Sequence, residues 1–146
     1  MSESQITWHW LPLAHHRRGE VDRCFLLPCG RGRRVARCAR CTGVYPALLA
    51  ALLLQGAFRV GPVGPADWLA ALCGVFPALF DWGLHWLGRR RGTNALRLAT
   101  GAILGLSLGR GLWLYFRDQR CEIFWVQLGL LVCGAMAFEL VRRLRI

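Results

Sequence analysis

The sequence contains no lysine, few acidic residues and no long apolar run near its start. All 19 basic residues are arginine, which we interpret as the composition bias of a GC-rich bacterial genome. Residues 1–42 hold no uninterrupted apolar run of the length that a signal peptide needs. We therefore expect no cleaved leader, and we expect the first membrane helix to insert intact.

Acidic residues are scarce, at 8 of 146, so the formal net charge is +11, yet 55% of the residues are hydrophobic. A nucleic-acid-binding domain would spread its positive charge over a folded face. Here the arginines and the apolar residues occupy separate stretches, a pattern typical of membrane proteins. The expected partner is the lipid bilayer, and nucleic acid is excluded.

Four apolar stretches can be separated, at roughly 43–58, 68–87, 95–116 and 123–140. Each is near the ~20 residues that a helix needs to cross a bilayer. Short polar connections between them favour antiparallel neighbours. The sequence therefore predicts an all-α fold, a polytopic bundle of four transmembrane helices over 43–146. A cytoplasmic segment, 1–42, precedes it and contains cysteine and histidine.

The arginines lie mainly on one side of this predicted bundle. Fourteen fall in the N-terminal segment, the loop at 89–91 and the C-terminus, whereas the other two loops hold three. The positive-inside rule then places both termini in the cytoplasm, in the bacterial inner membrane. Arginines at that face could also contact anionic lipid head groups.

A stripe of small residues runs along the third apolar stretch, at Gly101, Gly105 and Gly109. Small residues at every fourth position let helix backbones approach closely in lipid. The stripe predicts a face that packs on another helix, and it is a candidate surface for a homo- or hetero-oligomer. Asn94 and Arg97 lie on the same stripe and are expected to point into the bundle.

Asp81 and His85 are four residues apart, on one face near the end of the second stretch. Asp81 is roughly 9 Å from the helix end at 1.5 Å per residue. A carboxylate at that depth is costly unless it is paired. Arg97, across the short loop, is the expected partner. The pair could be structural, a polar site at the cytoplasmic mouth, or both.

Two cysteines, Cys38 and Cys41, form a C-x-x-C at the start of the first helix. Two such thiolates can chelate a tetrahedral zinc ion. Further candidate ligands lie upstream, and the predicted set is His16, Cys38, Cys41 and Cys24, with His15 and Cys29 as alternatives. A redox dithiol and simple packing cysteines remain the other two interpretations.

Several of these residues form blocks that resemble a known family. They are Cys-Ala-Arg-Cys-Thr-Gly-Val-Tyr at 38–45, Asp81 after an apolar helix, and Thr93-Asn94-x-x-Arg97-x-x-Thr100-Gly101. Together they resemble domain-of-unknown-function family 2085, a family of small bacterial membrane proteins, over residues 15 to about 110. The resemblance implies a membrane location and supplies no activity.

Two classes of function fit a cytoplasmic-facing polar site of Asp81, His85, Asn94, Arg97 and Arg40. The first is a binding or accessory membrane protein in which a metal holds the N-terminal segment over the bundle. The second is a membrane enzyme or transporter acting on an anionic lipid or a small anion. Arg97 and Arg40 would then contact the anion, and Asp81 or His85 would transfer protons.

Overall fold

The computed structural model describes residues 6–7, 23–28, 34–58, 61, 63–86 and 93–144. For 6–7, 85–86 and 142 the description covers the backbone alone. Of the predicted site residues, His16 lies outside these ranges, as do the alternative ligands His15 and Cys29. The side chain of His85 is likewise outside the description.

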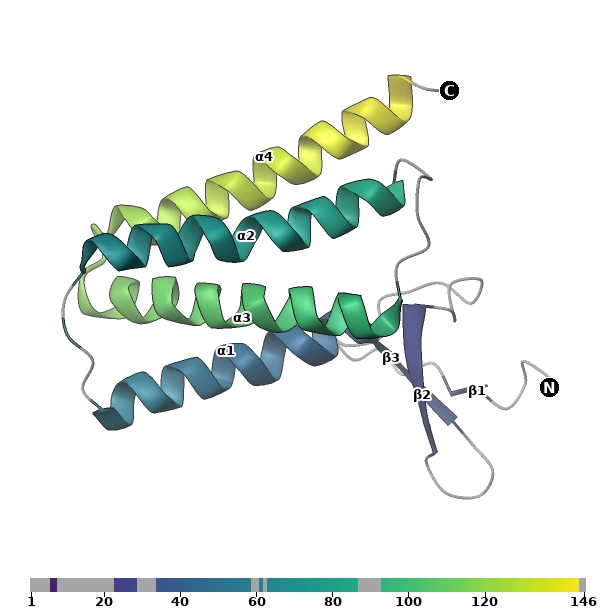
Figure 1. Cartoon of the computed structure of the whole chain (residues 1–146), viewed down its shortest axis with the longest axis horizontal. Coiled ribbons are helices and arrows are strands. Elements are labelled where there is room, and N and C mark those ends of the chain that lie inside the picture. The colour runs from purple at the N-terminus through teal and green to yellow at the C-terminus, as the bar shows by residue number, and fades with distance from the viewer. Residues whose placement is uncertain are drawn as a thin grey trace.

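Four long helices form the body of the molecule (Figure 1). They are α1 (Ala39–Phe58), α2 (Pro65–Trp86), α3 (Asn94–Arg117) and α4 (Glu122–Leu144). Each begins one to four residues before the apolar stretch that predicted it, and two of the helices have a recognisable starting residue. Pro65 suits the first position of α2, since its missing N–H needs no partner there. Thr93 caps α3, where its hydroxyl accepts a hydrogen bond from the Leu96 N–H at 3.2 Å.

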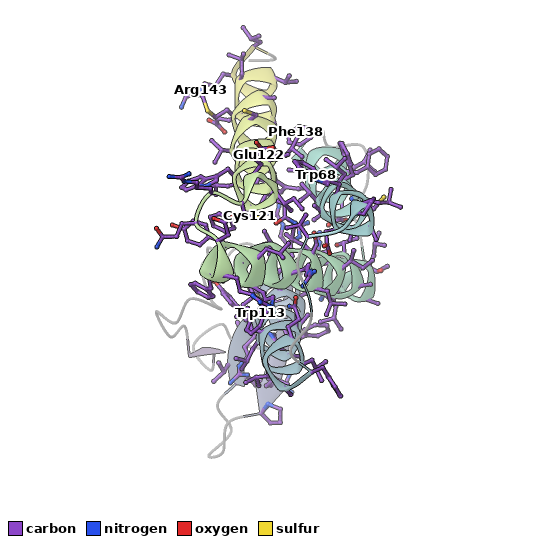
Figure 2. The ribbon with its side chains drawn as sticks, turned by 90° about the vertical axis from the view of Figure 1, so that its left-hand side faces the viewer. Trp68, Trp113, Cys121, Glu122, Phe138 and Arg143 are labelled. Atoms are coloured by element: carbon purple, nitrogen blue, oxygen red, sulfur yellow. The ribbon has the colours of Figure 1, made fainter. Side chains whose placement is uncertain are left out.

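Three of the four helices are long and apolar enough to cross a membrane, at Ala39–Phe58, Pro65–Leu84 and Glu122–Val141. The remaining helix, α3, has 24 residues and is long enough, but it carries Arg97, Arg110 and Arg117. It lies centrally and packs against α1, α2 and α4 (Figure 2). These contacts bury Arg97, whereas Arg117 at the end of the helix is exposed.

The glycine stripe of α3 packs on α1 of the same chain. A Cβ at Gly101 would lie 2.5 Å from the Arg40 carbonyl oxygen, and one at Gly109 would lie 2.7 Å from the Cβ of Ala51. A Cβ at Gly105 would overlap the carbonyl oxygen of Val44. The predicted packing face is confirmed, and its occupant is α1. An oligomer built through these glycines would first have to displace α1.

The N-terminal segment differs from the all-α prediction, because it contains a small sheet. Strands β1 (Ile6–Thr7), β2 (Cys24–Pro28) and β3 (Arg34–Cys38) pair in the order β1-β3-β2. The pairing of β2 with β3 is antiparallel, and that of β1 with β3 is parallel. In β3, Ala36 and Cys38 are buried while Arg37 is exposed, the two-residue alternation of a strand. That alternation was too short to be recognised among so many arginines.

Strand β3 leads directly into α1, because Ala39 begins the helix. The sheet is therefore attached to one end of the helix bundle (Figure 1). We call this the sheet end: α1 and α3 begin there, and α2 finishes there. The opposite end, where α1 and α3 finish and α2 and α4 begin, is the loop end.

Candidate functional site

Three cysteines meet at the sheet end, each from a different element. Cys24 of β2 and Cys38 of β3 are directly opposite partners in the antiparallel pair. Opposite residues of such a pair project to the same face, with Cβ atoms about 5 Å apart. Cys41, in the first turn of α1, is in hydrogen-bond contact with Cys38 and close enough to Cys24 for their charges to interact. We call these three residues the cysteine cluster.

The cysteine cluster is screened from solvent. Cys24 is 5% exposed and Cys38 is 4% exposed, and Cys41 is partly buried. The Thr42 hydroxyl donates to the Cys38 carbonyl oxygen at 2.8 Å, which fixes the chain where the strand becomes the helix. Within the described ranges, no three His, Cys, Asp or Glu side chains are arranged to hold a metal ion. Thiols nevertheless have the donor chemistry that zinc prefers, and His16, the fourth predicted ligand, lies outside those ranges.

The expected ion pair between Asp81 and Arg97 is wrong, because the partner of Asp81 is Arg40. The Arg40 Nη2 donates to the Asp81 Oδ2. Asp81 is 8% exposed and Arg40 is 24% exposed, so the contact is largely shielded from water. The first turn of α1 lies directly on α3, where Gly101 leaves space for the Arg40 backbone. This close approach brings the Arg40 side chain within reach of α2.

Arg40 also connects this ion pair with the cysteine cluster. It immediately precedes Cys41, and the two side chains are close enough to interact electrostatically. The carboxylate of Asp81 and the thiol of Cys41 therefore face the same guanidinium. In this arrangement Arg40 offsets the negative charge of Asp81 and lies beside the cysteine cluster.

Asn94 and Arg97 point inward from the first turns of α3, as predicted. Arg97 is 5% exposed and Asn94 is half-buried. The Arg97 Nη1 donates to the Asn94 Oδ1 at 3.4 Å, and the Asn94 Nδ2 donates to the Cys24 carbonyl oxygen at 3.3 Å. Asn94 thereby joins α3 to β2, next to the cysteine cluster.

His85 occupies the last turn of α2, one turn beyond Asp81. Its backbone position agrees with the prediction that both residues belong to one face at the sheet end. The role assigned to its imidazole stays a prediction.

A second polar cluster, at the loop end, was not predicted. Arg110 of α3 binds both carboxylate oxygens of Asp67, at 2.8 and 3.0 Å. It also donates to the Gln55 Oε1 at 3.1 Å and to the Gly61 carbonyl oxygen at 3.3 Å. One guanidinium therefore ties α1, the following loop, α2 and α3 together. Its sequence signal was an arginine inside the third apolar stretch, seven residues from the helix end.

Ser107 and Gln127 form a third polar contact that the sequence analysis did not find. The Gln127 Nε2 donates to the Ser107 Oγ at 2.8 Å and to its carbonyl oxygen at 3.1 Å. The Ser107 hydroxyl lies over Gly74, where a Cβ would collide with it. Gln127 is 1% exposed, so this contact fastens α4 to α3 away from water.

The three family-like blocks come together in space. The Cys-Ala-Arg-Cys block, Asp81 and the block from Asn94 to Gly101 all meet at the sheet end. No curated protein and no solved structure matches the chain. The model of a family described as "Predicted membrane protein (DUF2085)" matches residues 19–110, more than half of the chain, and the chain belongs to that family.

Proposed function

We propose that this protein is a metal-stabilised binding or accessory protein of the bacterial inner membrane, with zinc bound at the cysteine cluster. The observation that supports the proposal is the proximity of Cys24, Cys38 and Cys41 from β2, β3 and α1. Their side chains are not arranged around a metal ion in this structure, so zinc would have to draw them together. Three thiolates and one imidazole form a closed tetrahedral shell of the kind found in structural zinc sites. His16 is the proposed fourth ligand.

The proposed role of the metal follows from where its ligands lie. The end of β3, the start of β2 and the first turn of α1 come together at this point, and the strands are too short for stability on their own. A bound ion would link both strands to the start of α1, because metal binding stabilises the folded arrangement of its ligands. The sheet would then be held over the ends of α2 and α3 as a fixed cytoplasmic surface.

The proposed orientation places the sheet end in the cytoplasm. It rests on the fourteen arginines at this side against three at the other. In a reducing compartment the cysteines would stay reduced and available as metal ligands instead of forming stable disulfides. All four helices, the polar α3 included, would cross the bilayer.

The metal content of detergent-purified full-length protein tests this proposal. We expect about one zinc per chain in the wild type, and little in Cys38→Ser. Cys133→Ser is the matched control, because Cys133 is exposed on α4 and should leave the zinc content unchanged. Protein without stoichiometric metal would overturn the proposal.

The redox alternative gives a different result in the same samples. Opposite residues in an antiparallel pair have Cα atoms about 4.5–5.5 Å apart, within the range that a disulfide can bridge. Intact-mass and peptide analysis of protein purified without reductant would show a Cys24–Cys38 disulfide if the cysteine cluster is a redox centre. A metal-free, disulfide-bonded protein would favour that interpretation.

The second hypothesis is an enzyme or transporter for an anionic lipid or small anion, in which Arg40 and Arg97 would both contact the anion. Arg40 forms an ion pair with Asp81, so its charge is already neutralised and it would not act together with Arg97 on an anion. Arg97 alone retains the charge that such an anion would need.

A further inference from the structure

Arg97 is a deeply buried cation whose charge has no carboxylate partner in the part of the chain that the structure describes. It is 5% exposed, and its one side-chain hydrogen bond among those residues goes to the neutral Asn94 at 3.4 Å. A guanidinium has five N–H donors. Most of its N–H groups therefore have no protein partner among the described residues, and no nitrogen of Arg97 is both unpaired and fully sealed from solvent.

Among the described residues, the charges near Arg97 do not remove this excess of positive charge. Asp81, the buried carboxylate at the sheet end, pairs with Arg40. The first turn of α3 adds partial positive charge, because the peptide dipoles of a helix point their positive ends toward its N-terminus. A buried charge without a counter-charge is costly. The position consequently favours an anion.

We propose that Arg97, oriented by Asn94, binds the phosphate group of a ligand at the sheet end. The planar fork of a guanidinium matches two oxygens of a phosphate and binds them with charge-assisted hydrogen bonds. Asn94 holds one side of this fork and is itself fixed by the Cys24 carbonyl oxygen. The remaining N–H groups are then presented in a defined direction.

The phosphate could belong to a phospholipid head group or to a free anion. Arg97 is the fourth residue of α3, about 5 Å along the helix axis from its first residue. That depth is close to the level of lipid phosphates if α3 spans the bilayer. This site is separate from the proposed zinc centre and does not depend on metal binding.

Thermal unfolding of the wild-type protein tests the proposal without any mutation. In micelles of a maltoside detergent, which contain no phosphate, we expect inorganic phosphate to raise the Tm relative to chloride at equal ionic strength, or added phosphatidylglycerol to raise it relative to added diacylglycerol. A rise on the order of 3 °C is expected at ligand concentrations well above Kd. A response to phosphate identifies a soluble anion, and a response to phosphatidylglycerol alone identifies a lipid head group. Equal Tm values in all four conditions would overturn the proposal.

Two variants assign the response to Arg97. Arg97→Gln should weaken binding roughly tenfold to a hundredfold, the loss expected for a hydrogen bond to a charged group, and should abolish the Tm rise. Arg143→Gln is the control: Arg143 lies near the end of α4, is 73% exposed and pairs with Glu139 (Figure 2). If Arg97→Gln keeps the full response, or Arg143→Gln loses it, the anion binds elsewhere and the assignment is wrong.

Discussion

Removing the positive charge of Arg40, which pairs with Asp81, should destabilise the protein strongly. Asp81 is 8% exposed, so Arg40→Gln leaves a buried carboxylate without its cation. Removing one partner of a buried pair typically costs 3–5 kcal/mol. Because Arg40 is 24% exposed, water can partly replace it, and we expect about 3 kcal/mol, the low end of that range.

A double-mutant cycle in mixed detergent micelles measures the coupling directly. The free energy of unfolding would be compared for wild type, Arg40→Gln, Asp81→Asn and the double variant. The double variant should lose less than the sum of the single losses, by more than about 1 kcal/mol. The exposed pair of Arg143 with Glu139 is a matched control, and its coupling should not exceed about 0.5 kcal/mol.

A second cycle distinguishes the two candidate partners of Asp81. Combining Asp81→Asn with Arg97→Gln should give a smaller coupling than combining it with Arg40→Gln, because the carboxylate contacts Arg40. A coupling to Arg97 as large as that to Arg40, or additive losses in the Arg40 cycle, would refute the reasoning.

Three further predictions concern the helix packing, the loop end and the topology. Gly105→Val should destabilise by about 3 kcal/mol or more, because the valine side chain would meet the α1 backbone. Gly129→Ala, where a Cβ meets nothing within 4 Å, is the control and should be neutral or slightly stabilising. An equal loss of stability in the two variants would contradict the packing. Arg110→Gln should cost about 2 kcal/mol, the loss expected for a hydrogen bond between charged groups, because the partly buried Asp67 loses its cation. Asp67→Asn added to it should recover part of that loss in the same unfolding assay. Alkaline-phosphatase fusions should be inactive at the C-terminus and active near Gly64, and the reverse pattern would overturn the orientation.

The helices were predictable because their signal is long and local. Apolar stretches of about twenty residues bounded by arginine or proline leave few alternatives to a helix. The glycine stripe likewise predicted a packing face, because its spacing is a property of α3 alone. Neither feature requires knowledge of a distant segment.

The ion pairs and the strands could not be predicted in this way, because the pairs depend on tertiary geometry and the strands are very short. Choosing Arg97 for Asp81 relied on the short loop between α2 and α3, whereas Arg40 arrives from α1 through the close contact at Gly101. Asp67 and Arg110 are 43 residues apart, so no local pattern joins them. The strands have two to five residues, too few for alternation to outweigh composition.

The cysteine cluster was predicted partly from local spacing and partly depends on tertiary geometry. The C-x-x-C spacing of Cys38 and Cys41 was visible in the sequence, and it places them at the end of β3 and in the first turn of α1. Cys24 was chosen from several upstream candidates, and the antiparallel register now places it opposite Cys38. That register could not be derived without first recognising the strands.

Zinc K-edge X-ray absorption on detergent-purified full-length protein tests the central claim most directly, because it identifies the atoms bound to the metal. Zinc at the cysteine cluster should show three sulfur neighbours at about 2.3 Å and one nitrogen at about 2.0–2.1 Å. In Cys24→Ser the number of sulfur neighbours should fall, which would assign one of them to β2. A shell of oxygen and nitrogen alone, or protein that retains no zinc, would contradict the account.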